Sequence, residues 1–207
     1  MPAFTIRPAI GTDIPDLARL IVELYHSELP GALSGCRAGQ ERLLAYTLHA
    51  NDEAALTNRL VVCDDQQRVI GTGMLQFPNE PAYERAPQGT IAAAVRELGI
   101  RPTLKLASVV VRSLIGVYHH TDPQSALIHS VVLTAVARGQ GAGQTLMAAL
   151  EAQIRSRGLT RSRLQVLETN TAAQRFYRRC GYDEIWRLDG WRARLDWPSL
   201  VMEKVLA

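Results

Sequence analysis

The chain has 207 residues, of which 47% are hydrophobic and 21% are charged, and its formal net charge is +3. This length suffices for one domain with a hydrophobic core, or for one domain with an insertion. The weak positive charge argues against a nucleic acid or an anionic membrane as partner, because these need a clustered basic face, but it suits a small anionic ligand.

Three cysteines occur in the chain, at Cys36, Cys63 and Cys180. Their number is odd and no two of them share a C-x-x-C spacing, which favours free thiols in a reducing compartment over a disulfide framework or a metal site. The first residues lack the basic and apolar regions of a signal peptide, and polar residues interrupt the longest apolar stretch. We therefore expect a cytoplasmic protein with no metal and no membrane partner.

The first third of the chain predicts a strand, two helices and a hairpin. The expected elements are a strand at 4–7, a helix from 14 onward, a helix at 40–49, and a hairpin of strands at 59–63 and 68–77. Thr12 or Asp13 is the expected cap of the first helix, with Pro15 in its first turn.

The segment at about 78–123 reads as an insertion. Four prolines punctuate it, and two helices are expected in it, at 90–98 and 105–117. The segment is too short to bury a core of its own, so we expect a single domain over residues 1–207 with this helical insertion.

The last part of the chain alternates strands and helices. The expected elements are strands at 126–133, 163–167, 182–188 and 200–205, and helices at 141–157 and 171–180. This order predicts an α/β domain in which helices cover a mixed sheet.

A glycine-rich turn follows the expected strand at 126–133. Gly139, Gly141 and Gly143 stand there, just after Arg138 and at the start of a helix. Without a Cβ, backbone N–H groups can converge on a phosphate, and the helix N-terminus and the arginine charge add to the attraction. The turn therefore predicts a pyrophosphate site. A ligand-free turn and a dinucleotide fold stay open as alternatives, although the spacing departs from G-x-G-x-x-G and no Walker-type ending follows.

Two segments in register resemble the signatures of the GNAT acyltransferases. The run Arg138-Gly139-Gln140-Gly141-Ala142-Gly143 is similar to the family's Arg/Gln-x-x-Gly-x-Gly/Ala signature. The strand at 164–167, followed by Asn170, Ala172-Ala173, Phe176-Tyr177 and Gly181-Tyr182, is similar to the family's later run of a strand, Asn, Ala, Tyr and Gly-aromatic. The resemblance spans nearly the whole chain except about 78–123.

The resemblance implies the fold and the co-substrate. The fold would be a mixed central sheet of about seven strands, of α+β type, with helices on both faces and with parallel strands 4 and 5 splayed apart. Acetyl-CoA would insert its pantetheine arm between these strands and pair with the main chain of strand 4. The residues that the resemblance assigns to binding CoA are Val131, Val132, Leu133, Arg138, Gly139, Gln140, Gly141, Ala142, Gly143, Gln144 and Asn170. Asn170 also stands where a helix N-cap is expected, and both roles can coexist.

Tyr177 is the candidate general acid. It stands seven residues after Asn170, at the family's spacing for the tyrosine that protonates the departing thiolate. The alternative is a core aromatic beside Phe176.

His129 is the candidate base. Many family members carry a glutamate near the position of Leu127, and His129 lies two residues further, on the same face of the strand. An imidazole that titrates near neutrality suits a base or an anchor for a proton-carrying water. A hydrogen-bonded structural histidine is the alternative, and Glu168, His119 and His120 are the fallback candidates.

The acceptor is less clearly encoded. Trp186, Trp191 and Trp197 cluster near the last hairpin, where they can line an apolar pocket, form a dimer seam or serve packing. The resemblance implies an acetyl-CoA-dependent N-acetyltransferase that acts on a primary amine of a small, amino-acid-like molecule by direct attack in a ternary complex. A protein or peptide N-terminus is the second acceptor class, a non-catalytic acyl-CoA-binding regulatory module is the rival function, and a homodimer stays open.

Overall fold

The computed structural model describes residues 4–29, 31–78, 80, 86–116, 122–188 and 198–206, with the side chains of 52, 53 and 112–116 left out of the description. Its strands are β1 (Thr5–Pro8), β2 (Arg59–Cys63), β3 (Val69–Gln76), β4 (Ser125–Leu133), β5 (Arg161–Leu167), β6 (Asp183–Arg187) and β7 (Ser199–Val205). Its helices are a 3₁₀ turn η1 (Gly11–Asp13), α1 (Ile14–Glu28), α2 (Arg37–Leu56), α3 (Thr90–Leu98), α4 (Ile100–Gly116), α5 (Ala142–Ser156) and α6 (Thr171–Arg179).

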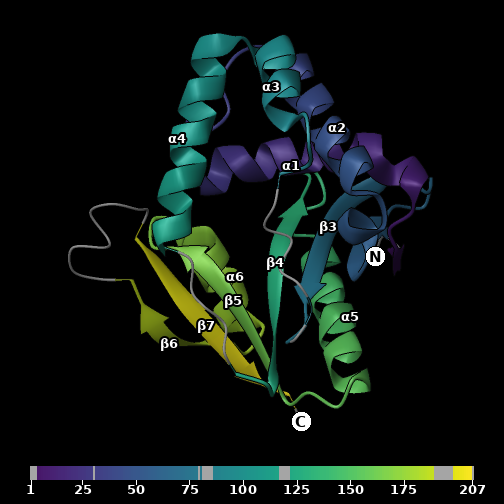
Figure 1. Cartoon of the computed structure of the whole chain (residues 1–207). Helices are drawn as coiled ribbons and strands as arrows, with labels where there is room; N and C mark the ends of the chain where they lie inside the picture. The colour runs from purple at the N-terminus through teal and green to yellow at the C-terminus, as the bar shows by residue number, and fades with distance from the viewer. Residues whose placement is uncertain are drawn as a thin grey trace.

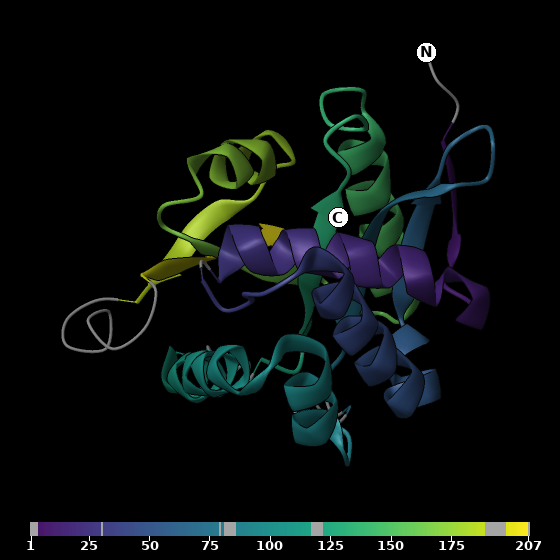
Figure 2. The ribbon, with the colours of Figure 1, turned by 90° about the horizontal axis from the view of Figure 1, so that it is seen from above.

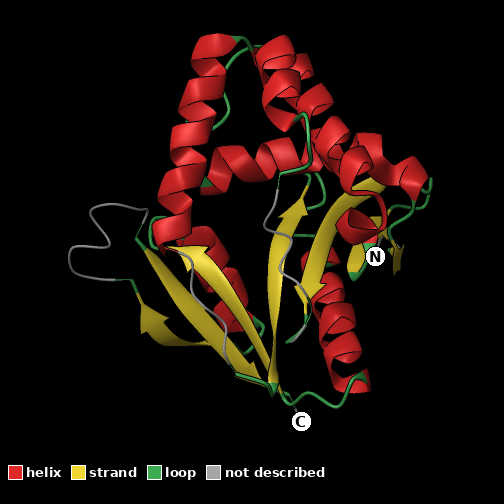
Figure 3. Ribbon diagram, viewed as in Figure 1, coloured by secondary structure: helices red, strands yellow, loops and turns green. Residues whose placement is uncertain are grey.

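The seven strands form one mixed sheet, in the order β1-β2-β3-β4-β5-β7-β6 (Figure 1). Neighbouring strands are antiparallel except β4 and β5, which are parallel. Helices cover both faces, as Figure 3 shows. The predicted mixed sheet of about seven strands is confirmed.

Strands β4 and β5 pair over their first four residues only. The ladder runs from Ser125 opposite Arg161 to Ile128 opposite Leu164, although β4 continues to Leu133 and β5 to Leu167. Beyond this point β4 stays with β3 and β5 with β7, so the two strands diverge toward the side on which α1 lies (Figure 1). The expected splay of strands 4 and 5 is therefore present.

A bulge in β4 lies just past the point where the pairing with β5 ends. The register with β3 shifts between Thr72 and Met74, and Ser130 has a φ of 54°. Such an extra residue locally disrupts a ladder and bends the strand. The bulge thus accompanies the divergence of the two strands.

Two hydrophobic cores lie on opposite faces of the sheet. One is formed under α1, α2 and α3 and includes Leu17, Leu43 and Val61. The other lies under α5 and α6, where Leu146, Leu150 and Ile154 form the buried stripe of α5 that their spacing predicted. None of the described helices is long and apolar enough to cross a membrane.

Most predicted helices are confirmed, with two extended boundaries. Helix α2 runs over Arg37–Leu56 instead of 40–49, because Ala55 adds a buried contact beyond the polar residues that follow His49. Helix α4 begins at Ile100 instead of 105. Pro102 is tolerated there because the first N–H groups of a helix have no partner within it.

The expected cap of α1 is wrong in detail. Asp13 occupies the N-cap position with Pro15 in the first turn, but its carboxylate makes no cap hydrogen bond. It accepts instead from both Arg7 Nη atoms, at 2.7 and 2.8 Å, and from the Ile10 N–H at 2.9 Å. Asp13 therefore ties the end of β1 to the start of α1.

Helix α1 crosses the molecule between two groups of helices. Seen from above, α5 and α6 lie on one side of it and α3 and α4 on the other (Figure 2). Its C-terminal end reaches the region where β5 runs into α6 (Figures 1 and 2).

Candidate active site

The glycine-rich turn leads directly into α5. Gly139 and Gly141 have φ values of 76° and 91°, in the left-handed region that favours glycine. A Cβ placed on either residue would meet no atom within 4 Å, so the space beside the turn is open. The first backbone N–H of α5 with a helical partner is that of Thr145, which bonds the Gly141 carbonyl. The N–H groups of the preceding helical residues are available to an anion, as expected of a helix N-terminus.

Two side chains brace this turn. The Arg138 Nε donates to the Leu133 carbonyl at 3.2 Å, and the Gln140 Nε2 donates to the Val136 carbonyl at 2.7 Å. Arg138 is exposed, so its charge lies at the surface beside the turn. Residues 138–144 thus combine a positive charge, open backbone and a helix N-terminus, and this set fits a pyrophosphate.

Gly143 differs from the other two glycines because its missing side chain serves packing. A Cβ on Gly143 would lie 3.0 Å from the Phe176 Cζ and 3.1 Å from the Leu133 Cδ1. The absence of a side chain therefore lets α5 sit close to β4 and α6. The structure thus gives Gly143 a packing contact that Gly139 and Gly141 lack, beside the phosphate role that the sequence predicts for all three.

The last residues of β4 pair on one side only. Leu133 and Val132 lie opposite Gly71 and Thr72 of β3, while the ladder to β5 has ended at Ile128. In the described part of the chain no strand pairs with Val131–Leu133 on the side of β5. An extended amide-bearing chain can add to such an edge as a strand would.

Asn170 caps α6, as expected. Its Oδ1 accepts from the Ala173 N–H at 3.1 Å. Its side-chain N–H groups make no hydrogen bond to the described part of the chain, so they stay available to a ligand.

Tyr177 is nearly buried, with 7% of its surface exposed, and lies on α6. Its ring packs against Phe176 and Tyr182, with centroids 5.3 and 6.2 Å away. Within the described residues its hydroxyl has no hydrogen-bond partner. Burial raises the pKa of the Tyr177 phenol well above its usual value, and the charges of Glu28 and Cys180 raise it further. The phenol therefore keeps its proton at neutral pH.

His129 lies on the other face of the sheet. It pairs with Met74 of β3, which pairs with Arg59 of β2, and the Arg59 Nη2 is 3.1 Å from the Met74 sulfur. Residues opposite each other share a face, and this row faces α1 and α2, because Val61, two residues after Arg59, belongs to their core. Burial and the charge of Arg59 lower the pKa of His129 to about 4. The imidazole, whose Nδ1 is 3.1 Å from the Ser130 Oγ, is therefore neutral at pH 7.

A sequence model of the acetyltransferase (GNAT) family matches residues 21–182, which include the glycine turn, the splayed strands, Asn170 and Tyr177. The chain belongs to this family. It is thus an acetyltransferase of a family that uses acetyl-CoA, and the resemblance seen in its motifs is confirmed.

Solved structures share the fold of this GNAT chain. One is Ard1 from Thermoplasma volcanium, 16% identical with a TM-score of 0.60, where the match covers 99% of each chain. Another is ribosomal-protein-alanine N-acetyltransferase from Brucella melitensis, 20% identical with a TM-score of 0.57, covering 98% of this chain and 99% of that one. A third is Naa20 from Chaetomium thermophilum in complex with a bisubstrate analogue, 18% identical with a TM-score of 0.59, covering 98% and 86%. A comparison with curated protein sequences found no significant match.

The fallback residues of the GNAT site have other partners or lie outside the described residues. Glu168 forms an ion pair with Arg187 at the surface. Trp186 is partly buried on β6, whereas His119, His120, Trp191 and Trp197 lie outside the described residues. The Cys180 thiol has a pKa raised by burial, so it stays protonated and is a poor nucleophile.

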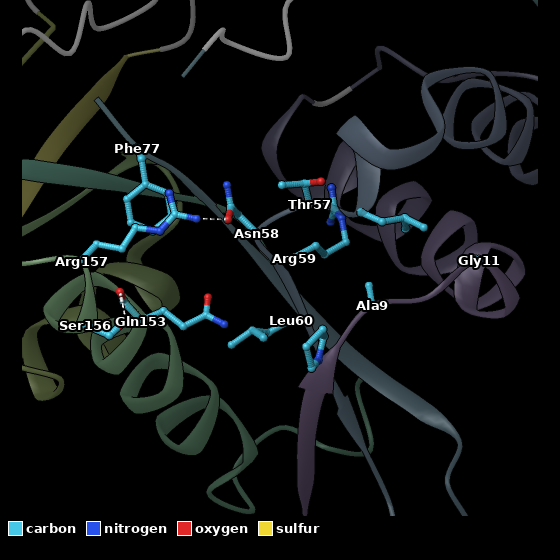
Figure 4. A pocket seen from close by; sticks show the side chains of 12 residues that line it. Ala9, Gly11, Thr57, Asn58, Arg59, Leu60, Phe77, Gln153, Ser156 and Arg157 are labelled. Carbon is cyan, nitrogen blue, oxygen red and sulfur yellow. Dashed lines mark hydrogen bonds between the residues drawn. The ribbon is translucent and has the colours of Figure 1, made fainter. Parts of the chain in front are cut away.

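A cavity of about 540 Å³ lies away from this site, between the C-terminal ends of α2 and α5 and the first strands (Figure 4). Arg157 stacks over the Phe77 ring at 3.8 Å and donates to Glu80 and Asn58. These contacts already use the guanidinium of Arg157, one of two arginines that line the cavity. The glycine turn, β4 beyond Ile128 and Tyr177 contribute nothing to its lining.

One residue that the sequence does not single out lies near Tyr177. Glu28, the last residue of α1, is close enough to Tyr177 for its charge to raise the pKa of the phenol. No local pattern marks it, because it precedes Leu29-Pro30 like any polar residue at a helix end.

Proposed function

We propose that this acetyltransferase transfers the acetyl group of acetyl-CoA to the primary amine of a small, amino-acid-like molecule by direct attack in a ternary complex. The amine nitrogen forms the new bond to the thioester carbonyl carbon, the C–S bond breaks, and the thiolate takes the proton of Tyr177. The observation that carries the proposal is Tyr177, a nearly buried residue whose hydroxyl keeps its proton and has no hydrogen-bond partner in the described chain.

The CoA contacts that we propose follow the geometry of the turn and of β4. The pyrophosphate would lie on the N–H groups of residues 139–144 beside Arg138, and the pantetheine amides would pair with the main chain of Val131–Leu133. Support comes from the open space at Gly141 and from the missing strand partner of β4 on the side of β5. The Asn170 side-chain amide supplies a further donor.

His129 has a more limited role in this proposal than that of a titrating base. With a pKa of about 4 it is neutral throughout the physiological range, and an imidazole of such low basicity accepts a proton weakly. It suits an anchor for the amine or for a water molecule on the α1 face of the sheet.

Helices α3 and α4 stand on the side of α1 opposite α5 and α6 (Figure 2). We propose that these two helices border the acceptor site and limit it to a small molecule. The second candidate is a peptide or protein N-terminus, since three solved structures of the same fold carry the names Ard1, Naa20 and ribosomal-protein-alanine N-acetyltransferase.

Two measurements test the proposal. CoA should raise the melting temperature, and thiol release from acetyl-CoA should be followed with a panel of amines, amino acids and short peptides. Turnover with small amines supports the proposal. Turnover with peptides alone shows instead that the acceptor is a peptide or protein N-terminus, the second candidate. If CoA binds but no amine is acetylated, a non-catalytic CoA-binding module replaces the enzyme. If NAD protects the chain from heat and CoA does not, the site is a dinucleotide site.

A further inference from the structure

Glu28 differs from the other carboxylates of helix α1. Asp16 pairs with Arg19 on the same helix, and Glu23 pairs with Arg37 of α2. Glu28 is partly buried and has no hydrogen bond or ion pair with the described part of the chain. A carboxylate in that situation is unusual, because burial of a charge without a partner is unfavourable.

Glu28 is the last residue of α1, and this end of the helix faces the region where the splayed strand β5 runs into α6 in both views (Figures 1 and 2). From α6, Tyr177 is within electrostatic reach of the Glu28 carboxylate. From the α4 side, the Lys105 ammonium would lie 3.3 Å from a Cβ placed on Gly31, three residues after Glu28.

Other titratable groups near the end of α1 are directed elsewhere. His26 on the same helix has its Nε2 2.9 Å from the Gln40 Oε1 of α2. His129 lies beside Arg59, whose charge lowers the pKa of the imidazole. Among the described titratable side chains, Tyr177 is the one whose pKa is raised by the charge of Glu28.

We propose that Glu28 is the general base of the acetyl transfer and takes the proton of the acceptor's ammonium, directly or through one water molecule. This inference rests on the proposed function and names its base. It pairs a carboxylate on α1 with the phenol on α6, so that proton acceptor and proton donor approach the reacting centre from opposite faces of the sheet.

The proton count closes with these two groups. Glu28 takes one proton from the ammonium, and the free amine forms the N–C bond while the C–S bond breaks. The thiolate takes the Tyr177 proton, and the new amide nitrogen sheds its second proton. Of the two protons lost by nitrogen, one restores the phenol of Tyr177 and the other passes to solvent.

The basicity of Glu28 suits this role better than that of His129. Burial raises the pKa of Glu28 to about 7, which is close to the pH at which a cytoplasmic enzyme works. Proton transfer is most effective when the pKa of the base lies near the operating pH. The pKa of His129, at about 4, lies well below that range.

The decisive variant is Glu28→Gln, with Glu23→Gln as the matched control on the same helix. We expect Glu28→Gln to lower kcat/KM by about 10²-fold at pH 7.5, in the range usual for a general base, and to leave the CoA-induced thermal shift unchanged. The rise of kcat/KM through pH 7 should vanish in this variant and persist in Glu23→Gln and His129→Gln. Two acceptors of different basicity separate this limb from the titration of the amine itself.

A readout without turnover accompanies the kinetics. In protein labelled with ¹³C at glutamate carboxyls, one NMR signal should titrate near pH 7 and be missing in Glu28→Gln. If Glu28→Gln folds poorly, Glu28→Asp keeps the carboxylate and should retain the pH limb at reduced kcat/KM. Wild-type turnover with an unchanged Glu28→Gln profile overturns this inference alone. Absence of turnover in the wild type, with CoA binding intact, overturns the proposed function and the role of Glu28 together.

Discussion

Two buried tyrosines, Tyr177 and Tyr182, provide a comparison that separates chemistry from stability. Their rings are in contact, yet only one hydroxyl is used by the fold. The Tyr182 hydroxyl lies 2.7 Å from the Ser162 Oγ and donates to the Glu151 Oε1 at 3.2 Å, whereas the Tyr177 hydroxyl has no partner within the described residues. Replacing each tyrosine by phenylalanine removes one oxygen and keeps the ring.

The structure sets the expected size of each effect. Tyr182→Phe loses two hydrogen bonds in a fully buried site, one of them to a carboxylate, so unfolding should require about 2 kcal/mol less. For a chain of this size that corresponds to a fall in Tm of about 4–8 °C. Tyr177→Phe loses no hydrogen bond, so its stability should change by no more than about 0.5 kcal/mol. Its kcat should fall about 10²-fold, which is about 2.7 kcal/mol in the activation barrier.

The assay combines urea unfolding, CoA-induced thermal shift and steady-state thiol release for both variants. CoA affinity should stay near the wild-type value in each, because neither hydroxyl belongs to the contacts proposed for the pyrophosphate and the pantetheine amides. An unchanged kcat in Tyr177→Phe, with chemistry shown to limit the rate, would refute Tyr177 as the acid and assign protonation of the thiolate to water or another group. A large stability loss in Tyr177→Phe would instead show that its hydroxyl has a structural partner.

The other predictions concern the glycine turn and the end of β1. Gly141→Val should abolish the CoA-induced thermal shift while the chain stays folded by circular dichroism, because the new side chain enters the open space beside the turn. Gly143→Ala should lower the free energy of unfolding by about 1 kcal/mol, since overpacking against Phe176 outweighs the gain in helix propensity, and urea titration measures it. Asp13→Asn should lower stability by about 2 kcal/mol at pH 7 through the lost Arg7 contacts. The hydrogen bonds from Arg7 lower the pKa of Asp13 in the folded state. The stabilisation by the Asp13 carboxylate is therefore fully present above its unfolded-state pKa of about 3.9 and is lost as the pH falls through its folded-state pKa. The difference in stability between wild type and Asp13→Asn should disappear in acid.

Local patterns predicted the elements better than their ends. The strand at 59–63 and the helix at 90–98 were predicted at their observed bounds, because a run of apolar residues and a helix-ending glycine delimit them. Helix α2 extends beyond the predicted end at His49, because Ala55 and Leu56 contact the core after a stretch of small and polar residues that shows no helical apolar spacing. Helix α4 begins before its predicted start at 105, because Pro102 lies in the first turn, where a proline is compatible with a helix.

Some features of the candidate site are predictable from neighbouring residues in the sequence, and others depend on residues far apart in it. The glycine turn and the Asn170 cap were readable because each depends on backbone conformation over a few residues. The packing role of Gly143 is not predictable from the local sequence, because it depends on Phe176, which is 33 positions further along the chain. The splay was inferred through the resemblance, since the end of a ladder between two strands has no signature in either strand alone.

The acid–base assignment depends most on tertiary structure. The sequence predicts His129 as the base from the ordinary titration of an imidazole, but the residue is partly buried near Arg59, which stands 70 positions earlier, and its pKa falls to about 4. The pKa of Glu28 shifts in the opposite direction. A solvent-facing glutamate at a helix end has a pKa far below neutrality, and burial raises the pKa of Glu28 to about 7. Desolvation disfavours the charged form in both, which makes the histidine a weaker base and the glutamate a stronger one. The same physical effect therefore favours the proposed base Glu28 on the helix over His129 on the strand, and the pH profile of Glu28→Gln against that of His129→Gln decides between them.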